Sequence, residues 1–184
     1  LEREGIRVHF PQGQTCCGQP AYSSGYPDEA RAVALAQLNL FAEPWPVVVP
    51  SGSCGGMMRN HYPHLFEEDP ALHAKAVALS ERIYELSEFL VHVVNFDHAD
   101  QGSPCTIALH TSCHARRQMG AHETSAALLD SLGQVKVVTQ ARIEECCGFG
   151  GTFALLYADI SEAIATDKVA AIKATGAASV VSAD

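Results

Sequence analysis

The chain has 184 residues, of which 47% are hydrophobic and 18% are charged, and its formal net charge is −9. This length and composition are typical of a globular protein that buries a core without cross-links, and they argue against disorder. The acidic balance gives no electrostatic footprint for nucleic acid, and no apolar stretch approaches the roughly 20 residues of a membrane span, so we expect neither nucleic-acid binding nor a direct membrane span.

The beginning of the chain does not resemble an export signal. Charged residues occur at Glu2, Arg3, Glu4 and Arg7, where a signal peptide would have an apolar segment. We therefore expect a cytoplasmic protein, in which seven cysteines indicate metal or redox chemistry rather than disulfides. The first residue is not Met, and the opening residues resemble a helix that runs into a strand, so we expect further residues upstream.

The first half of the chain is predicted to alternate strands with helices. Ile6 to Phe10 has the alternation of a strand, and Pro27 to Glu43 has the apolar spacing of an amphipathic helix with Pro in its first turn. Val47 to Val49 is a β-branched run between prolines, which is typical of a buried parallel strand. A short helix is expected at Gly55 to Phe66 and a long one at Pro70 to Val94.

A polar segment, Asn95 to Pro104, separates the two halves, and we place the lobe boundary there, with lobes at residues 1–97 and 101–184. Strands alternating with helices predict right-handed βαβ units on parallel sheets, with the cysteines at the carboxyl ends of strands. We therefore expect an α/β fold with two Rossmann-like βα lobes. The elements predicted in the second half are strands at Thr106 to His110, Lys136 to Thr139 and Ser179 to Ser182, and helices at Glu123 to Leu132 and Asp159 to Ala174.

The tripeptide Cys-Cys-Gly occurs twice, and its positions, Cys16 to Gly18 and Cys146 to Gly148, are 130 residues apart (16 to 146). Each copy precedes a polar or glycine turn, an Ala-rich helix and a short strand. Because both the tripeptide and its surroundings recur, we predict an internal duplication with pseudo-twofold symmetry between the lobes. The offset carries Cys54 to Asp184 and carries Cys113 back to a position before Leu1, so we expect both ends to be truncated.

Four strings carry a resemblance over essentially the whole chain: FPQGQTCCGQPAYSSGY, VPSGSCGGM, HTSCHARRQMG and ECCGFGGTFA. They resemble the CCG-domain (cysteine-rich domain) iron–sulfur proteins, which include the CCG-bearing subunit of heterodisulfide reductase and the iron–sulfur subunit of glycolate oxidase. Within this family, the four strings are most similar to those of the small two-repeat branch that takes part in lactate utilization. The resemblance implies an iron–sulfur electron-transfer subunit of a three-protein oxidoreductase complex that oxidises L-lactate to pyruvate, with the other subunits as partners.

Thiolates are the soft ligands that iron–sulfur clusters need. Where the family motif has CxxC, this chain has Cys54 followed by Gly, Gly and Met57, so a fifth ligand is missing from the first repeat. An ordinary four-cysteine 4Fe-4S cluster per repeat is the form expected in an intact chain. Cys105 has no counterpart and is predicted to be a core or surface thiol. We expect Cys17 and Cys54 to lie within about 15 Å of each other even without metal. The predicted ligand groups are Cys16, Cys17 and Cys54 in the first repeat, and Cys113, Cys146 and Cys147 in the second.

Two other interpretations stay open, and no catalytic residue is assigned. The vicinal cysteines also suit thiol–disulfide chemistry of the heterodisulfide reductase type, which needs an exposed thiolate of low pKa. Zinc accepts both Cys and His, and His110 and His114 flank Cys113, while His61 and His64 are three residues apart. A zinc-stabilised scaffold without catalysis is therefore an alternative, less favoured because no CxxC is paired with closely spaced histidines.

Overall fold

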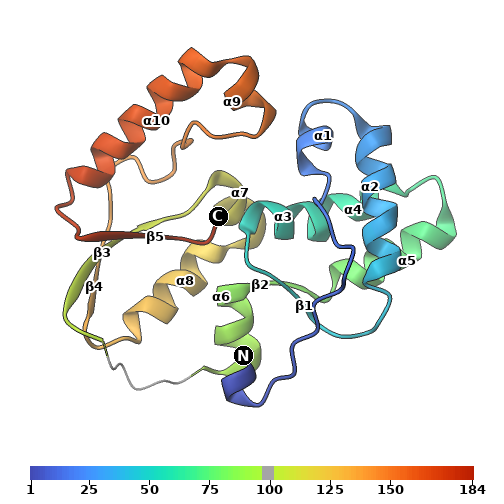
Figure 1. Ribbon diagram of the computed structural model, residues 1–184, viewed down its shortest axis with the longest axis horizontal. Coiled ribbons are helices and arrows are strands. Elements are labelled where there is room, and N and C mark those ends of the chain that lie inside the picture. The colour runs from blue at the N-terminus through green and yellow to red at the C-terminus, as the bar shows by residue number, and fades with distance from the viewer. Residues whose placement is uncertain (97–101) are drawn as a thin grey trace.

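The protein folds as an α/β structure with two small parallel sheets (Figure 1), which confirms the predicted fold class. The structure is a computed structural model that describes residues 1–96 and 102–184. Strand β1 (Val47–Val49) pairs with β2 (Ile83–Glu85) in the first sheet. The second sheet has the order β4-β3-β5, and both of its pairs are parallel. The predicted lobe limits, at residues 97 and 101, lie outside the described residues.

The helices lie around the two sheets, and none in the described residues combines the length and the apolar character needed to cross a membrane. The described first half contains a short 3-10 turn, η1 (Glu2–Glu4), and α1 (Gln19–Ser23), α2 (Pro27–Leu40), α3 (Gly52–Gly56), the π-helical η2 (Met57–His61), α4 (Tyr62–Leu65), α5 (Pro70–Ser80), α6 (Leu86–Phe89) and the π-helical η3 (Leu90–Val94). The described second half contains β3 (Cys105–His110), α7 (Cys113–Met119), α8 (Ala121–Asp130), β4 (Val135–Val138), α9 (Thr152–Leu156), α10 (Ala158–Lys173) and β5 (Ser179–Ser182).

Helix α2 provides one wall of the main core. It begins at Pro27, whose missing N–H costs nothing in a first turn, and acidic residues follow where the helix dipole favours them. Ala30, Ala34 and Leu38 recur at helical spacing on its buried face. They belong to the same apolar cluster as the fully buried Tyr62 and residues from α7. The core of the first half therefore also holds the second half in place.

The predicted strand at Ile6 to Phe10 is wrong, because the structure has no strand there. Val8 is 48% exposed and Phe10 is 64% exposed. An alternating pattern becomes a strand only when a neighbour supplies hydrogen bonds, and within residues 1–96 and 102–184 no strand pairs with this segment.

The predicted long helix at Pro70 to Val94 is also wrong, since it is interrupted by β2. Its apolar spacing fits a helix, but Ile83 to Glu85 pair in parallel register with β1, and the Val47 N–H donates to the Arg82 carbonyl. Glu85 then starts α6 through a reciprocal capping box with Glu88. Pairing with a distant strand has overridden the local helical pattern.

The predicted short helix at Gly55 to Phe66 is present, but it begins earlier, at Gly52, and its middle portion is π-helical. Cys54 is therefore in a first helical turn rather than in a loop. The helix after Cys113, α7, was not predicted. Its N-cap is Ser112, whose hydroxyl accepts a hydrogen bond from the Ala115 N–H.

Helices α3 and α7 pack unusually closely because three of the five residues of α3 are glycines. A Cβ on Gly52 would lie 2.3 Å from the Cβ of Ala115, and one on Gly56 would lie 2.2 Å from Oε1 of Gln118. Only glycine permits this approach. The contact brings the start of α3, with Cys54, against the start of α7, with Cys113.

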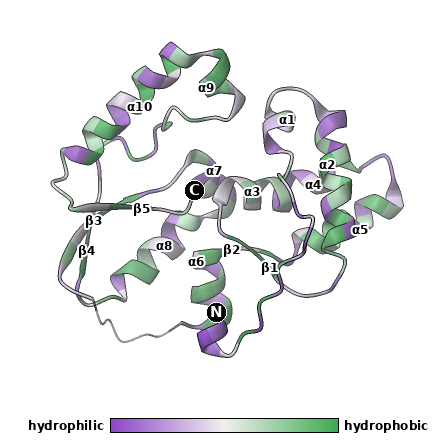
Figure 2. Ribbon diagram, in the orientation of Figure 1, coloured by the Kyte–Doolittle hydropathy of each residue, from purple (hydrophilic) through white to green (hydrophobic). Residues whose placement is uncertain are grey.

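The outer part of the second half is more exposed to solvent than the first half. Figure 2 shows α9 as a hydrophobic segment at the edge of the molecule. Leu155 is 83% exposed and Leu156 is 73% exposed. The apolar core of the described residues is thus concentrated in the first half and at the α3–α7 contact.

Candidate functional site

The first cysteine group comes together at the start of α1 and the start of α3. The thiols of Cys17 and Cys54 are in hydrogen-bonding contact. Cys16 belongs to the same electrostatic neighbourhood, because all three sulfurs affect the pKa of Tyr62. Cys17 is buried, Cys54 is half-buried and Cys16 is exposed.

The contact between Cys17 and Cys54 shifts the pKa values of the two thiols in opposite directions. The hydrogen bond from Cys17 is the main cause that lowers the pKa of Cys54 to about 6, and a hydrogen bond from Ser51 adds to it. The same contact, followed by burial, raises the pKa of Cys17. Cys54 loses its proton first because it is the less buried of the two and has two donors for its thiolate. The pair is therefore poised to present a thiolate near neutral pH.

The second group forms where β3 runs into α7. Cys113 is half-buried, and burial is the main cause that raises the pKa of its thiol, followed by the charges of Cys146 and, more weakly, Cys147. Arg117 acts in the opposite direction. Because the charges of Cys146 and Cys147 act on the thiol of Cys113, the three sulfurs lie near one another.

The two CCG turns have the same geometry. Gly18 and Gly148 have φ values of +86° and +89°, a region that favours glycine. In each turn the glycine N–H donates to the sulfur two residues before it, at 3.4 Å from Sγ of Cys16 and at 3.4 Å from Sγ of Cys146. A Cβ would also collide with the following helix, 2.5 Å from the Ser161 carbonyl in the second copy. This match supports the predicted duplication.

One acidic side chain, which was not predicted from the sequence, lies between the two groups. Asp184 accepts hydrogen bonds from the hydroxyls of Ser51 and Ser53 at 2.6 Å and 2.9 Å, and another from the hydroxyl of Ser112. Burial acts to raise its pKa, but these donors together lower it. Since Ser51 precedes α3 and Ser112 precedes α7, the carboxylate ties together the two helix starts that carry Cys54 and Cys113.

The donor set suits a cluster better than a single metal ion. In the part of the chain that the structure describes, no three Cys, His, Asp or Glu side chains converge closely enough to hold one ion. A cluster is bound by thiolates around its whole periphery, one to each iron, and hydrogen bonds to sulfur tune it. Two groups of three thiols, each with a glycine N–H on one sulfur, supply three of the four thiolates that a 4Fe-4S cluster takes.

The histidines considered for zinc have other neighbours. His61 stacks against Tyr22, His64 pairs with Glu67 at 2.7 Å, and Nδ1 of His114 lies 3.6 Å from Sγ of Cys113. Nδ1 of His110 is 3.5 Å from Gln140. The structure thus brings one histidine against a predicted cysteine ligand and gives the others contacts of their own.

Comparison with known proteins identifies the family. The sequence profile of the cysteine-rich domain named CCG matches residues 1–59 and 107–184. The chain belongs to the CCG family. Both matched regions contain a CCG turn and one further predicted ligand, whereas Cys105 falls between them.

Curated CCG proteins of similar sequence share one name. The chain is 42% identical to lactate utilization protein A of Bacillus velezensis, 41% identical to that of Bacillus subtilis and 39% identical to that of Geobacillus thermodenitrificans. Each alignment covers all 184 residues of this chain and 77% of the relative.

Tyr62 supports the first CCG turn from beneath. Its ring is fully buried, and its hydroxyl donates to the carbonyl of Cys17 at 2.9 Å. We predict that Tyr62→Phe lowers the free energy of unfolding by about 1–3 kcal/mol, because the buried carbonyl loses its donor. Chemical denaturation measures the effect, and Tyr26→Phe, at a 59% exposed residue, is the control that should stay near wild type. Equal stabilities for both variants would contradict this role.

Two histidines of this CCG chain make its stability depend on pH. Burial is the main cause that lowers the pKa of His61 and of His110. The unfolded chain therefore binds protons first as the pH falls below about 6.5, and the folded state loses stability from there downward. Gln118 donates to the ring of His61 at 3.0 Å, so the neutral ring is the acceptor. We predict that His61→Gln reduces the fall in melting temperature between pH 7.5 and pH 5.5; an unchanged fall would exclude His61 as a contributor.

Proposed function

We propose that this chain is the iron–sulfur electron-transfer subunit of a multi-protein complex that oxidises L-lactate to pyruvate. The observation that carries the proposal is the repeated CCG turn, with the same glycine N–H on the same sulfur and a third cysteine from a helix start beside it. The name that its relatives share, lactate utilization protein A, supports lactate as the substrate of the complex.

In this proposal the chain contributes ligands and their surroundings. Cys16, Cys17 and Cys54 would supply three of the thiolate ligands of one 4Fe-4S cluster, and the second group (Cys113, Cys146 and Cys147) three of those of another. Such a cluster, when bound, takes up and releases single electrons. The glycine N–H groups stabilise the thiolates, and the burial of Cys17 keeps water from one side of the first site.

The test is iron and acid-labile sulfide analysis of the full-length gene product purified without oxygen. We expect both elements in stoichiometric amount, a broad brown absorption band, and bleaching of that band by lactate once the partner subunits are added. Colourless protein without sulfide would refute the cluster, and zinc in its place would favour the scaffold interpretation. A brown protein that lactate does not bleach in the assembled complex would refute the substrate.

A second candidate function rests on the contact between Cys17 and Cys54. A thiolate of lowered pKa beside a second thiol is the arrangement used in thiol–disulfide exchange. Cys54 would attack a disulfide substrate, and Cys17 would release the mixed disulfide by closing a bond to Cys54, so that the substrate gains the two electrons. Reduction of one equivalent of a disulfide substrate by cluster-free protein with both thiols reduced, abolished by Cys54→Ser, would favour this candidate over the first.

A further inference from the structure

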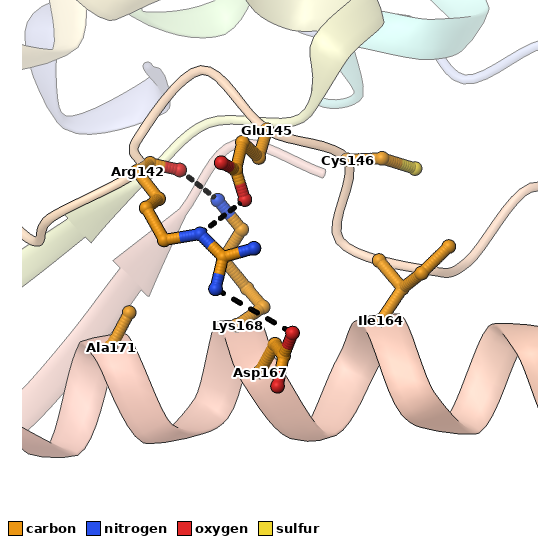
Figure 3. A pocket seen from close by; sticks show the side chains of 7 residues that line it. All are labelled: Arg142, Glu145, Cys146, Ile164, Asp167, Lys168 and Ala171. Carbon is orange, nitrogen blue, oxygen red and sulfur yellow. Dashed lines mark hydrogen bonds and ion pairs between the residues drawn. The ribbon is translucent and has the colours of Figure 1, made fainter.

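Lys168 is a buried cation beside the second CCG turn. It is 6% exposed, and its ammonium donates to the carbonyl of Arg142 at 2.7 Å and is 3.5 Å from that of Ile143 (Figure 3). With Cys146 it lines a cavity of about 240 Å³. Within the described residues it forms no ion pair. A lysine this deeply buried usually has a carboxylate partner. After Arg142, the charge of Lys168 also lowers the pKa of Glu145, which lines the same cavity.

The carboxylates nearby are engaged by another residue. Arg142 binds Glu145 at 2.6 Å and Asp167 at 3.5 Å, as Figure 3 shows, and all three side chains are more than half exposed. Exposed pairs of this kind are largely screened by water. The charge of Lys168 reaches the end of β3, since after burial it is the next cause that lowers the pKa of His110.

The first repeat has a neutral side chain in the equivalent place. Gly18 packs on α2 at Ala30, and Gly148 packs on α10 at Ser161, so the two helices correspond with an offset of 131 residues (30 to 161). The same offset carries Gln37 to Lys168. Gln37 is 3% exposed and donates to the hydroxyl of Thr15 at 3.0 Å, just before Cys16. Both side chains therefore tie their helix to the segment before CCG, but only the second is charged.

We infer that Lys168 tunes the second cysteine group, so that a cluster held there has a higher reduction potential than a cluster held by the first group. This inference rests on the proposed function. Reduction adds one electron and breaks no bond, so it makes the site more negative. A fixed positive charge in a poorly solvated place stabilises that state, and Gln37 offers the first group no such charge. Electrons that enter the chain would therefore collect at the second group.

The test is a redox titration of the anaerobic full-length protein, with dithionite as reductant and electron paramagnetic resonance as readout. Cys54→Ser and Cys113→Ser assign the two transitions to their groups. We expect Lys168→Gln, which keeps a donor but loses the charge, to lower the second potential so that the reduced-to-oxidised ratio at a fixed potential falls about tenfold. Lys168→Arg should stay near wild type. If Gln and Arg shift the potential alike, or neither shifts it, the inference is wrong.

If Lys168→Gln fails to retain its cluster, the reciprocal variant Gln37→Lys in the first repeat tests the inference instead. Gln37→Lys can still donate to Thr15, and it should raise the first potential while leaving the second unchanged. No shift in that variant would overturn the inference. Protein without iron and sulfide would refute the proposed function itself, whereas full cluster content with coincident potentials would refute only the role of Lys168.

Discussion

Cys54→Ser is expected to remove about half of the iron and sulfide from the full-length protein, because one of two clusters loses a ligand. Serine oxygen is a hard donor and a poor substitute for a thiolate. The contact between Cys17 and Cys54 would also be lost, and with it the main cause that raises the pKa of Cys17. Iron and sulfide analysis after anaerobic purification measures the loss, and the second group should be unaffected.

The seventh cysteine provides a matched control. Cys105 is half-buried in β3, its sulfur lies 3.8 Å from the Thr106 carbonyl, and it falls outside the regions that match the CCG profile. Cys105→Ser should therefore leave iron and sulfide at the wild-type level. Equal losses in the two variants would mean that iron content reports general damage. Full iron in Cys54→Ser would remove Cys54 from the proposed ligands.

The grouping of the cysteines as ligand sets stays a prediction, and it depends on order along the chain and on a general property of parallel sheets. Cys54 follows β1 and Cys113 follows β3, and the carboxyl ends of parallel strands meet at one edge, but the structure has no strand in the segment before Cys16 and Cys17. The strands Val47 to Val49 and Ser179 to Ser182 were predicted with the bounds that the structure has. Short β-branched runs, such as Val47–Val49 between Pro46 and Pro50, leave little choice of local structure.

The wrong predictions concern segments whose structure depends on a distant partner. Ile6 to Phe10 alternates correctly but has no strand beside it in the described residues. Ile83 to Glu85 fits a helix by spacing but pairs with β1, more than thirty residues earlier. Local periodicity does not contain that information, because the strand pair is stabilised by contacts that only the folded chain provides.

The correspondence of Gln37 with Lys168 had a signal in the sequence that was overlooked. The two CCG turns differ by 130 positions, but the helices after them differ by 131 because the second connection is one residue longer. Aligning the Ala-rich helices separately from the CCG turns would have paired a neutral with a charged residue at a buried position. The contact partners of these side chains still required the structure.

Replacing Gly52 by Ala at the contact between α3 and α7 is expected to have the second large effect, on the free energy of unfolding. Gly52→Ala would place a Cβ 2.3 Å from the Cβ of Ala115 and 2.5 Å from its Cα, so α3 has to move away from α7. At an open helical position the same change stabilises by up to about 1 kcal/mol. Here we expect the free energy of unfolding to fall by about 3 kcal/mol, as in overpacked cores. Because Cys54 and Cys113 lie at these helix starts, cluster content should fall as well.

Gly133→Ala is the control for this change, since a Cβ there would meet no atom within 4 Å and its φ is outside the left-handed region. It should leave stability unchanged or slightly raised, because alanine restricts the unfolded chain. Chemical denaturation of both variants alongside wild type compares the two glycines directly. The sign of the change is decisive: a Gly52→Ala protein at least as stable as wild type would show that α3 and α7 are not pressed together, and that some other contact sets the distance between the two cysteine groups.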